Sequence, residues 1–534
     1  MKNQLFIEKK FREIKKKNFL NYQKIHKKKF FSTKKKFLFK ISRILNILHE
    51  KNYSTNQWRI LIGTWLNLAL NIYFYNDYLK KYFPKKLEKI ILSESPEKHF
   101  PPLDYREFFK LINTKKYQLY LLKKLILKNS FNYKVRNKNT FKIKSNFTKI
   151  LYLKIIKLIS SKKTLFLIRS RFKLSQILQL ILKSKFKILP LIDPIEIYNI
   201  SGINYNKEKR IKFLSLFDKD DFDIAEFITE IIPSSYIENF LTYEKIGEKI
   251  LKKPSKVYTD TAHLDDDLFK NIITRVCLNK NFRLLIGQHG GNHRIHDQYV
   301  TNYHDDYKIC SKYLVWGKPI KPKEVKLSSI RIFNINQKDM IKDNIKYNVC
   351  YVFEALIKKQ FQSDFKRNDD YIRSLETKKI FLKKLKKKFI VRSYYDKNRY
   401  ENQINDKKLS KYLDIKLGLF KNNKEVLFES NIIVLDYMST MIFELISLNI
   451  PFVLILDSSN EYLSNFGKKF IKDLKKINLY FNNPARAAEF INNLPNDKNW
   501  WFEEKKQKKI LKLKKNYAYL SKFHINDWYK ILKD

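Results

Sequence analysis

The sequence predicts an α/β protein with two doubly wound domains that face a cleft, a helical N-terminal region and C-terminal helices. Short apolar runs alternate with helical stretches from residue 164 onward, and a second such set begins near residue 347. This alternation is typical of parallel sheets covered by helices on both faces. We therefore divide the chain into a basic arm, an N-terminal domain, a C-terminal α/β domain and basic C-terminal helices, at residues 1–40, 41–340, 341–495 and 496–534.

The N-terminal region is basic first and helical afterwards. Residues 1–40 contain fourteen Lys and one Arg against two Glu, so we expect a solvated arm that is also suited to anionic lipid headgroups. From Ile41 the pattern is helical, with Ser54 or Thr55 as the expected N-cap of one helix. Polar residues interrupt the apolar window Trp58–Leu79, which predicts a buried amphipathic helix and not a membrane span.

Two sets of strands are expected. In the first, "TLFLIRS", "FKILPLI", "PSKVYTDT" and "FRLLIGQHG" are short apolar runs, and "LDDDLFKNIITRVCLNK" is a helix between the last two. In the second, we expect strands in "YNVCYVFEA", "KKFIVRSYYD", "EVLFES", "NIIVLD" and "PFVLILD". Open parallel sheets bind ligands at the carboxyl ends of their strands, so we expect the functional site where these ends face the cleft.

The net charge and the cysteine content narrow the choice of binding partner and cellular compartment. The formal net charge of +57 normally indicates nucleic acid or an anionic membrane. However, the abundant residues (Lys, Asn, Ile, Phe and Tyr) are those that AT-rich codons encode, and Arg, which suits bidentate base contacts, is scarce. We therefore expect no specific nucleic-acid partner. The three cysteines are widely spaced, and residues 1–19 contain no apolar run long enough for a signal peptide, so we expect a cytoplasmic protein that can also lie peripherally at the inner face of the membrane.

Glycine and histidine concentrate in "GQHGGNHRIHDQYVTNYH", residues 287–304. The chain has nine of each, yet three glycines fall within residues 287–291 and four histidines within residues 289–304. Glycines after a strand allow close backbone approach to a ligand, and a histidine there suits proton transfer or a hydrogen bond to phosphate. These properties make His289 the candidate catalytic residue. A tight turn with an incidental histidine is the alternative.

The same segment has side chains at spacings that suit a metal site. They are His289, His293, His296, Asp297, His304, Asp305 and Asp306. On a helix, such spacing can supply zinc ligands. The glycines shortly before His293 argue against one continuous helix, so we expect no metal, and we identify no other cofactor. We expect His293, His296 and His304 to be surface or packing residues.

A second concentration of chemistry lies in "NIIVLDYMSTMIFELISLNIPFVLILD". The pattern predicts a strand at residues 432–435, a turn, and a helix that begins at Ser439 or Thr440 and ends at Asn449. This N-terminus offers two hydroxyls, exposed N–H groups and the positive end of the helix dipole. Together they favour the binding of a phosphate group. Glu444, one turn into the helix, is placed to accept hydrogen bonds from a ribose or sugar hydroxyl. An ordinary N-cap is the alternative.

Three segments together resemble bacterial transferases found near O-antigen and surface-polysaccharide loci. They are "LHEKNYSTNQWRILIGTWL", "LLIGQHGGN" with "KYLVWGK" downstream, and "VLDYMSTMIFELISLNIP". "IIPSSYIENF" and "FIVRSYYD" also fit, so the resemblance covers roughly residues 40–495. The "DYMST" turn is shared more widely with the nucleotide-sugar half of GT-B glycosyltransferases. Two positions depart from the family pattern, which usually has a small residue at Glu50 and an aromatic or small residue at His293.

The resemblance implies a GT-B-like transferase of surface polysaccharide biosynthesis with two Rossmann-like domains. Such an enzyme moves a glycosyl or related group from a nucleotide-sugar donor, bound by the C-terminal domain, to a glycan or lipid-linked acceptor on the N-terminal side. Peripheral membrane contact through the basic arm would fit such an acceptor. The family's cleft and donor-binding positions fall on Gln288, His289, Gly290, Gly291, Arg392, Asp436, Ser439, Thr440 and Glu444.

Two other functions are compatible with the sequence. A nucleic-acid- or membrane-binding basic protein without catalysis would lose binding steeply as salt increases. A metal-dependent hydrolase that uses the His289–His304 cluster would hold stoichiometric zinc and lose activity in chelator.

Overall fold

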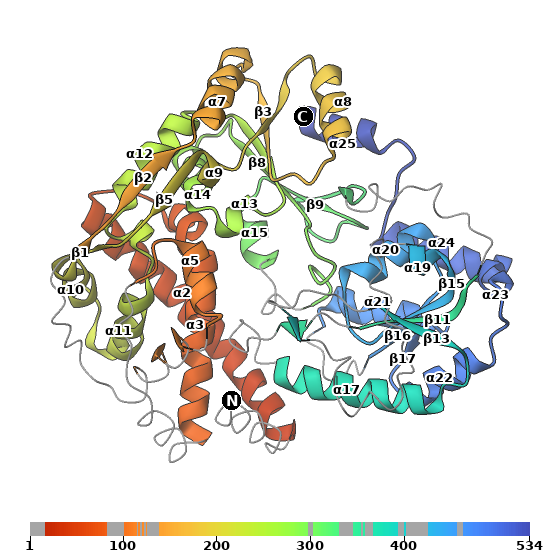
Figure 1. The fold of residues 1–534 in the computed structure, drawn as a ribbon. Helices are drawn as coiled ribbons and strands as arrows, with labels where there is room; N and C mark the ends of the chain where they lie inside the picture. Colours follow the sequence, from red (N-terminus) through yellow and green to blue (C-terminus); the bar gives the residue numbers. More distant parts are fainter. Residues whose placement is uncertain are drawn as a thin grey trace.

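The protein has two lobes, each built on a parallel sheet (Figure 1). The computed structural model describes residues 16–82, 101–114, 138–296, 303–330, 345–353, 367–392, 425–456 and 463–534, with short pieces between them. The first lobe carries a sheet of six strands and the second lobe a sheet of five. This confirms the prediction of an α/β protein with two Rossmann-like domains. The proposed boundary at residue 340 lies outside the described residues.

All six strands of the first sheet are parallel, in the order β4-β3-β7-β8-β9-β10. They are β3 (Leu165–Ile168), β4 (Ile188–Leu191), β7 (Lys256–Thr259), β8 (Arg283–Gly287), β9 (Lys312–Val315) and β10 (Glu324–Lys326). The chain goes from β3 outward to β4 and then returns to β7 on the other side of β3. Ligands bind doubly wound sheets at such a reversal of strand order, which places the carboxyl ends of β3 and β7 at the expected site.

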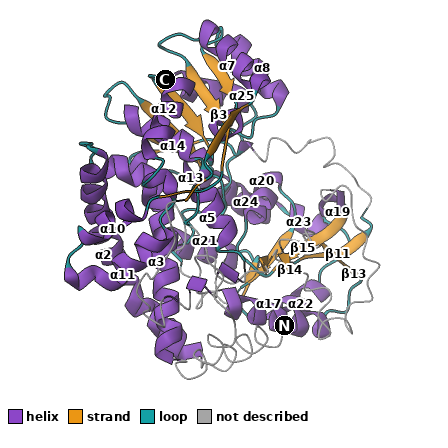
Figure 2. Ribbon diagram, turned by 60° about the vertical axis from the view of Figure 1, so that its left-hand side comes forward, coloured by secondary structure: helices purple, strands orange, loops and turns teal. Residues whose placement is uncertain are grey.

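Helices cover both faces of the first sheet (Figure 2). One face packs against α7 (Phe147–Ile159), α12 (Phe240–Ile250) and α14 (Asp267–Val276). The other face packs against α8 (Leu174–Lys183) and α25 (His524–Lys533). Smaller elements complete the lobe: β1 (Lys138–Asn139), β2 (Lys142–Ser145), α9 (Pro194–Ile197), β5 (Tyr198–Ser201), β6 (Asn204–Tyr205), α13 (Ala262–Asp265) and α15 (Tyr303–Ile309).

A helical layer flanks the first lobe and shares one apolar core. Its helices are α2 (Lys16–His49), α3 (Thr55–Tyr82), α5 (Tyr105–Leu111), α10 (Lys207–Ser215) and α11 (Phe222–Ile231). The predicted N-cap is present, because Gln57 N donates to Ser54 Oγ at 3.3 Å and Ser54 N donates to Gln57 Oε1 at 2.9 Å. Among the described helices, none is long and apolar enough to cross a membrane.

The end of the predicted basic arm is part of this helical core. Phe30, Phe37 and Leu38 of α2 are buried, and Lys34 pairs with Asp305 at 2.6 Å. Residues 30–40 therefore do not form a solvated arm, contrary to the expectation from their charge. The lysines mislead because Phe30, Phe37 and Leu38 between them face the core, while the lysine side chains reach the surface or a carboxylate. The side chains before residue 29 lie outside the described part of the chain.

The second sheet repeats the winding of the first, in the order β13-β11-β15-β16-β17, with every pair parallel. Its strands are β11 (Tyr347–Val352), β13 (Phe389–Arg392), β15 (Ser430–Leu435), β16 (Phe452–Ile455) and β17 (Tyr480–Phe481). The helices of this lobe are α17 (Arg367–Lys384), α19 (Glu425–Phe428), α20 (Thr440–Leu448), α21 (Asn465–Lys475) and α22 (Pro484–Asn492), and β12 (Leu356–Ile357) pairs with β14 (Tyr400–Glu401). Strand order reverses between β11 and β15.

One expected strand of the second set is wrong. "EVLFES" forms the single-turn helix α19, and β15 begins only at Ser430. Val426, Leu427 and Phe428 are all buried, as a strand would also have buried them. A four-residue apolar run does not distinguish a buried strand from a turn of buried helix, so the pattern alone could not decide.

The C-terminal segment starts on the second lobe and returns to the first. α23 (Asn499–Phe502) and α24 (Glu504–Tyr517) pack in the core of the second sheet, which confirms the predicted C-terminal helices. The chain then crosses over, with Tyr519 N donating to Trp316 O at 2.6 Å. Trp528 and Leu532 of α25 cover the first sheet beside α8 (Figure 1).

Candidate functional site

The carboxyl ends of the two sheets meet at a direct contact between the lobes. The loop after β8 reaches the N-terminus of α20, where Gly291 N donates to Thr440 Oγ1 at 3.0 Å. A Cβ on Gly291 would lie 2.7 Å from Thr440 Cα and 2.7 Å from Phe443 Cδ2. Glycine at this position thus permits close approach between the two lobes. The two segments singled out in the sequence are therefore neighbours in space.

Gln288 fixes the shape of this loop. Its buried side chain accepts a hydrogen bond from Trp316 N at 3.2 Å and donates to Gly290 O at 3.1 Å. A Cβ on Gly287 would lie 2.2 Å from Asp260 Oδ1 and 2.5 Å from the Tyr258 hydroxyl, so only glycine fits at the end of β8. The side-chain amide of Gln288 thus holds the loop in place through two hydrogen bonds, both to backbone groups.

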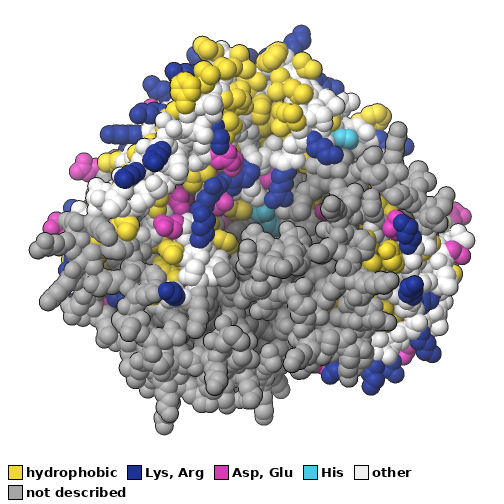
Figure 3. Space-filling view, in the orientation of Figure 1, with side chains coloured by type: hydrophobic (Ala, Val, Ile, Leu, Met, Phe, Trp, Pro, Cys, Tyr) yellow, Lys and Arg dark blue, Asp and Glu magenta, His cyan; other side chains and the backbone are white. Residues whose placement is uncertain are grey.

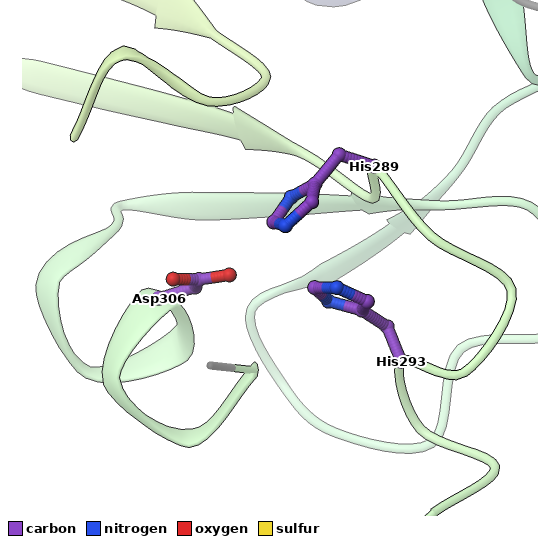
Figure 4. A group of neighbouring side chains, drawn as sticks. All are labelled: His289, His293 and Asp306. Atoms are coloured by element: carbon purple, nitrogen blue, oxygen red, sulfur yellow. The ribbon is translucent and has the colours of Figure 1, made fainter. Parts of the chain in front are cut away.

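His289 projects from this loop into a cluster of buried polar side chains (Figure 4). Its ring centroid is 4.1 Å from that of His293, and the two rings and the Asp306 carboxylate point toward one another. One potential ligand atom from each of the three residues lies within 4.8 Å of the others. His293, expected at the surface or in packing, is thus a buried neighbour of His289.

Two further side chains orient this cluster. The Tyr313 hydroxyl is 2.9 Å from His293 Nδ1, and His263 Nε2 is 2.9 Å from Asp306 Oδ1. Two polar atoms of the three central residues, His289 Nδ1 and Asp306 Oδ2, are buried without a hydrogen-bond partner in the described structure. Buried polar groups are normally paired, so these two atoms could take a water, a ligand or an ion as partner.

Burial keeps His289 and His293 neutral at physiological pH. Desolvation holds the pKa of His289 well below its usual range, and the nearby His293, His263 and Arg171 lower this pKa further. Desolvation also lowers the pKa of His293 to about 4. A neutral imidazole can accept a proton or offer one N–H, and it cannot act first as a cationic acid.

The other expected histidine and acidic positions lie elsewhere or outside the description. His296 is buried, but its backbone pairs with Leu463 as an isolated bridge away from the cluster. Asp297 and the side chain of His304 lie outside the described residues. The metal-compatible group therefore differs from the one that sequence spacing suggested.

On the second lobe, α20 begins and ends as predicted. Asn449 adopts a left-handed conformation with φ of 57° at its C-terminus. At the N-terminus, Ser439 makes no side-chain capping bond, and its Oγ is buried without a hydrogen-bond partner in the described structure. Ser439 is thus the N-cap residue of α20 by its backbone position, but its hydroxyl makes none of the hydrogen bonds that an ordinary N-cap side chain makes.

The remaining second-lobe candidates take different positions around this helix. Arg392, at the end of β13, lies over the first turn of α20, with its Nη1 3.6 Å from Met441 Sδ. Glu444 is half-buried in the second turn and forms no ion pair with a described residue. Asp436 is turned into the lobe instead, where its buried carboxylate pairs with the buried ammonium of Lys378 and accepts from Ser374 Oγ at 2.8 Å.

A pocket opens beside the Gln288 loop at the reversal point of the first sheet. Its lining includes Arg171, Asp260, Gln288, Trp316 and Ser329. Arg171 Nη1 also donates to His289 O at 3.4 Å. The pocket, the loop and the histidine cluster are thus parts of one region at the carboxyl end of the first sheet.

Residues 10–532 match the sequence model of a family described as LIC12162 family transferase. The chain belongs to the LIC12162 family of transferases. This confirms the prediction that the protein is a transferase. The match covers nearly the whole chain, so both lobes and the C-terminal helices belong to the family's common architecture.

Structural and curated comparisons add less about this LIC12162 family transferase. The crystal structure of MurG from Acinetobacter baumannii aligns with it at a TM-score of 0.37 and 10% sequence identity, over 69% of this chain and 99% of the MurG chain. No curated protein matches it.

Several residues of the candidate site were not identified from the sequence. His263 and Lys378 come from helices, and Arg171 and Tyr313 from near the ends of strands, so nothing in the local pattern joins them to the glycine-rich loop. Only Arg171 could have been suspected, because it follows an expected strand of the first set and such positions lie at the ligand-binding edge of a sheet. Asp306 was included among possible metal ligands, although on a helical spacing that the structure does not use.

Replacing Gly291 with alanine should disturb the contact between the lobes. The added Cβ meets the backbone of Thr440, which cannot move aside as a flexible side chain would. Overpacking of this kind typically costs about 1–3 kcal/mol, so we expect a lower melting temperature and lower activity. Gly290→Ala is the matched control, because its Cβ would meet only the His293 ring, at 3.1 Å. Equal melting temperatures for the two variants would contradict the close contact.

Proposed function

We propose that this transferase moves a glycosyl or related group from a nucleotide-activated donor to a glycan or lipid-linked acceptor. Surface polysaccharide assembly at the cytoplasmic face of the membrane is the process that the family resemblance favours. The observation that carries the proposal is the hydrogen bond between Gly291 N and Thr440 Oγ1. It brings a phosphate-binding type of helix N-terminus and a histidine suited to proton transfer into one site.

The donor phosphates would bind at the N-terminus of α20. The helix dipole and free N–H groups favour an anion there. The unpartnered Ser439 Oγ and the hydrogen of the Thr440 hydroxyl offer further donors, and Arg392 over the first turn supplies positive charge. In this proposal Gly290 provides backbone near the donor and Glu444 accepts from a ribose or sugar hydroxyl. Asp436 holds the turn through Lys378 rather than touching the donor.

His289 would act on the acceptor. Because burial keeps its imidazole neutral, it can accept the proton of an attacking hydroxyl. The imidazolium formed in that step would lie beside the donor phosphates, whose negative charge stabilises it. A hydrogen bond from the neutral imidazole to the leaving phosphate is the other role compatible with this position. Gln288 positions His289 by holding the loop through Trp316 and Gly290.

Removing the groups at the α20 N-terminus should weaken donor binding. A panel of UDP-, GDP-, CMP- and dTDP-sugars in a thermal-shift assay would first identify the donor. A charge-assisted hydrogen bond contributes about 1.5–3 kcal/mol, so Thr440→Ala and Arg392→Ala should each weaken binding by roughly tenfold or more in calorimetry. Thr440→Ser keeps the hydroxyl, and Arg486→Ala removes an exposed arginine of the same lobe, so both controls should bind normally. Wild-type affinity in Thr440→Ala and Arg392→Ala would place the donor elsewhere.

A metal-dependent reaction is the second candidate function, because a specific group of side chains favours it. His289, His293 and Asp306 provide two nitrogens and one oxygen, a donor set that suits zinc or a similar divalent ion. Tyr313 and His263 occupy the positions from which outer-shell groups orient metal ligands. Stoichiometric zinc in protein purified without chelator, absent from His293→Ala, would support this function. A metal-free protein that binds the donor fully would support the glycosyl-transfer function without a metal.

A further inference from the structure

An apolar surface covers the tip of the first lobe, around the edge strand β4 (Figure 3). We name this surface the apolar tip. It consists of the exposed residues Phe147, Leu151, Ile155, Leu158, Ile159, Leu174, Leu178, Leu182 and Phe186. They belong to α7, to α8 and to the turn after α8, and the two helices pack on opposite faces of the sheet beside β4. The tip therefore wraps around one edge of the lobe and faces away from the second lobe (Figure 1).

Helix α7 lies on the surface and carries apolar residues on its outer side as well as on its buried side. It buries Leu153 and Ile156 against the sheet. On its outer side, Phe147 is 79% exposed and Leu158 is 85% exposed. A surface helix normally carries polar residues on its outer face, and a helix that is apolar all round is normally covered. The outer side of α7 thus indicates a contact that the described chain does not provide.

Helix α8 continues the same surface with a row of leucines. Leu174, Leu178 and Leu182 are four residues apart and lie on one face, opposite the buried Leu180. Leu174 is 73% exposed and Leu182 is 70% exposed. Contiguous apolar patches on a protein surface mark interaction sites, whereas single exposed leucines do not.

The segment that forms the tip is strongly basic. Residues 147–187 contain nine Lys and two Arg, and no Asp or Glu. The two arginines lie beside carboxylates, because Arg169 pairs with Asp193 and Arg171 approaches Asp260. The lysines lie around the tip, and eight of them are exposed: Lys154, Lys157, Lys162, Lys163, Lys173, Lys183, Lys185 and Lys187.

We propose that the apolar tip docks the protein onto a bilayer that contains anionic phospholipids. An interfacial surface of this type buries its apolar side chains at the boundary between headgroups and acyl chains while basic side chains contact the lipid phosphates. Lysine suits this position because its aliphatic stem lies along apolar surface while the ammonium reaches the headgroup level. The contact is peripheral, since none of the described helices can span a bilayer.

The charge of the tip disfavours a second copy of the chain as the covering partner. A two-fold interface brings the same surface of both subunits together. It would therefore oppose two clusters of exposed lysines, with no acidic residue of the segment to neutralise them. An anionic lipid surface supplies the missing negative charge and the apolar environment together.

Docking in this orientation would bring the site close to the membrane. The loop Arg169–Lys173 joins β3 to α8, so the leucine row begins at Leu174, three residues after Arg171, which lines the pocket beside Gln288. A lipid-linked acceptor held in the bilayer could then reach the pocket without leaving the membrane. This consequence rests on the proposed function, whereas membrane docking itself does not.

The test is sedimentation of the full chain with vesicles of phosphatidylcholine, with and without phosphatidylglycerol. The wild type should bind the anionic vesicles and bind pure phosphatidylcholine weakly. The triple variant Leu158→Ser, Leu174→Ser, Leu182→Ser should partition at least tenfold less into anionic vesicles. A control triple variant, Ile380→Ser, Phe502→Ser, Leu511→Ser, removes exposed apolar residues of the second lobe and should bind as the wild type does.

Three outcomes would overturn the proposal. If the triple variant and the wild type bind anionic vesicles equally, the apolar tip is not the membrane-docking surface. Loss of binding after removal of residues 1–28, with full binding by the triple variant, would assign the contact to the basic arm. A dimer in light scattering that the triple variant converts to a monomer, without vesicle binding by the wild type, would identify the tip as a subunit interface. Calorimetry of donor binding on the same proteins would report the proposed function separately.

Discussion

Replacing His289 with alanine should lower turnover by about 10² to 10⁴-fold, the usual loss when a general acid or base is removed. The loss should appear with little change in melting temperature. The described hydrogen bonds that hold the loop come from the Gln288 side chain, the Gly291 amide and the backbone oxygen of His289, and alanine keeps all three. The measurement is turnover on the donor that the thermal-shift panel identifies, beside a thermal melt of the same variant.

Other histidines provide the controls for this prediction. His296→Ala removes a buried histidine from the same segment but outside the cluster, and it should retain most of the activity. We also expect His304→Ala to remain active. If the His289→Ala enzyme is fully active, His289 does not transfer the proton and that part of the proposal is wrong. Equal losses in His289→Ala, His296→Ala and His304→Ala, restored by added zinc, would favour the metal-dependent function instead.

Replacing Lys378 with methionine should destabilise the second lobe severely. The side chains of Lys378 and Asp436 are both completely buried, and the ammonium is the cation that neutralises the carboxylate. Removing one partner of a buried pair leaves an uncompensated charge and typically costs about 3–5 kcal/mol. Because Asp436 directly follows β15, the turn that leads to Ser439 should lose its geometry as well. Thermal unfolding and donor affinity should therefore fall together.

A neighbouring lysine and a double variant make this prediction specific. Lys379→Met removes the next lysine of α17, whose side chain is 40% exposed, and it should change stability little. Lys378→Met with Asp436→Leu removes both buried charges, and replacing a buried pair by apolar residues is often neutral or stabilising. If the double variant melts no higher than Lys378→Met, the pair does not account for the loss.

Most strands of the two sheets could be predicted because they are short, largely buried apolar runs, whereas β9, β10 and β17 were not among the expected strands. β10 is the partly polar "EVK" and β17 has only two residues, so neither gives a clear apolar run. Among the predicted strands, β15 is buried along its whole length, and the sequence shows it as an uninterrupted apolar run after Asn431. The same property caused the error at "EVLFES", since α19 is buried too. The start and end of α20 were predicted more closely because Ser439 and Asn449 act through local backbone geometry.

The partners of the site residues could not be predicted in the same way. Lys378 and Asp436 are separated by 58 residues, and His263 and Asp306 by 43. In the sequence, Lys378 is one lysine among many in an apparently solvated helix, and its burial depends on how α17 packs against the second sheet. Sequence position therefore located the loop and the helix terminus, whereas the pairs that fix their geometry required the tertiary structure.

The return of the C-terminal segment to the first lobe has a consequence for the order in which the protein is made. The strands of the six-stranded sheet are synthesised before the second lobe, yet one face of that sheet is completed by Trp528 and Leu532, which follow the second lobe in the chain. Until then, apolar residues such as Leu167 and Tyr258 on that face lack their cover. Transiently exposed apolar surface favours misassembly, and the first lobe can complete its packing only after the second lobe has been synthesised.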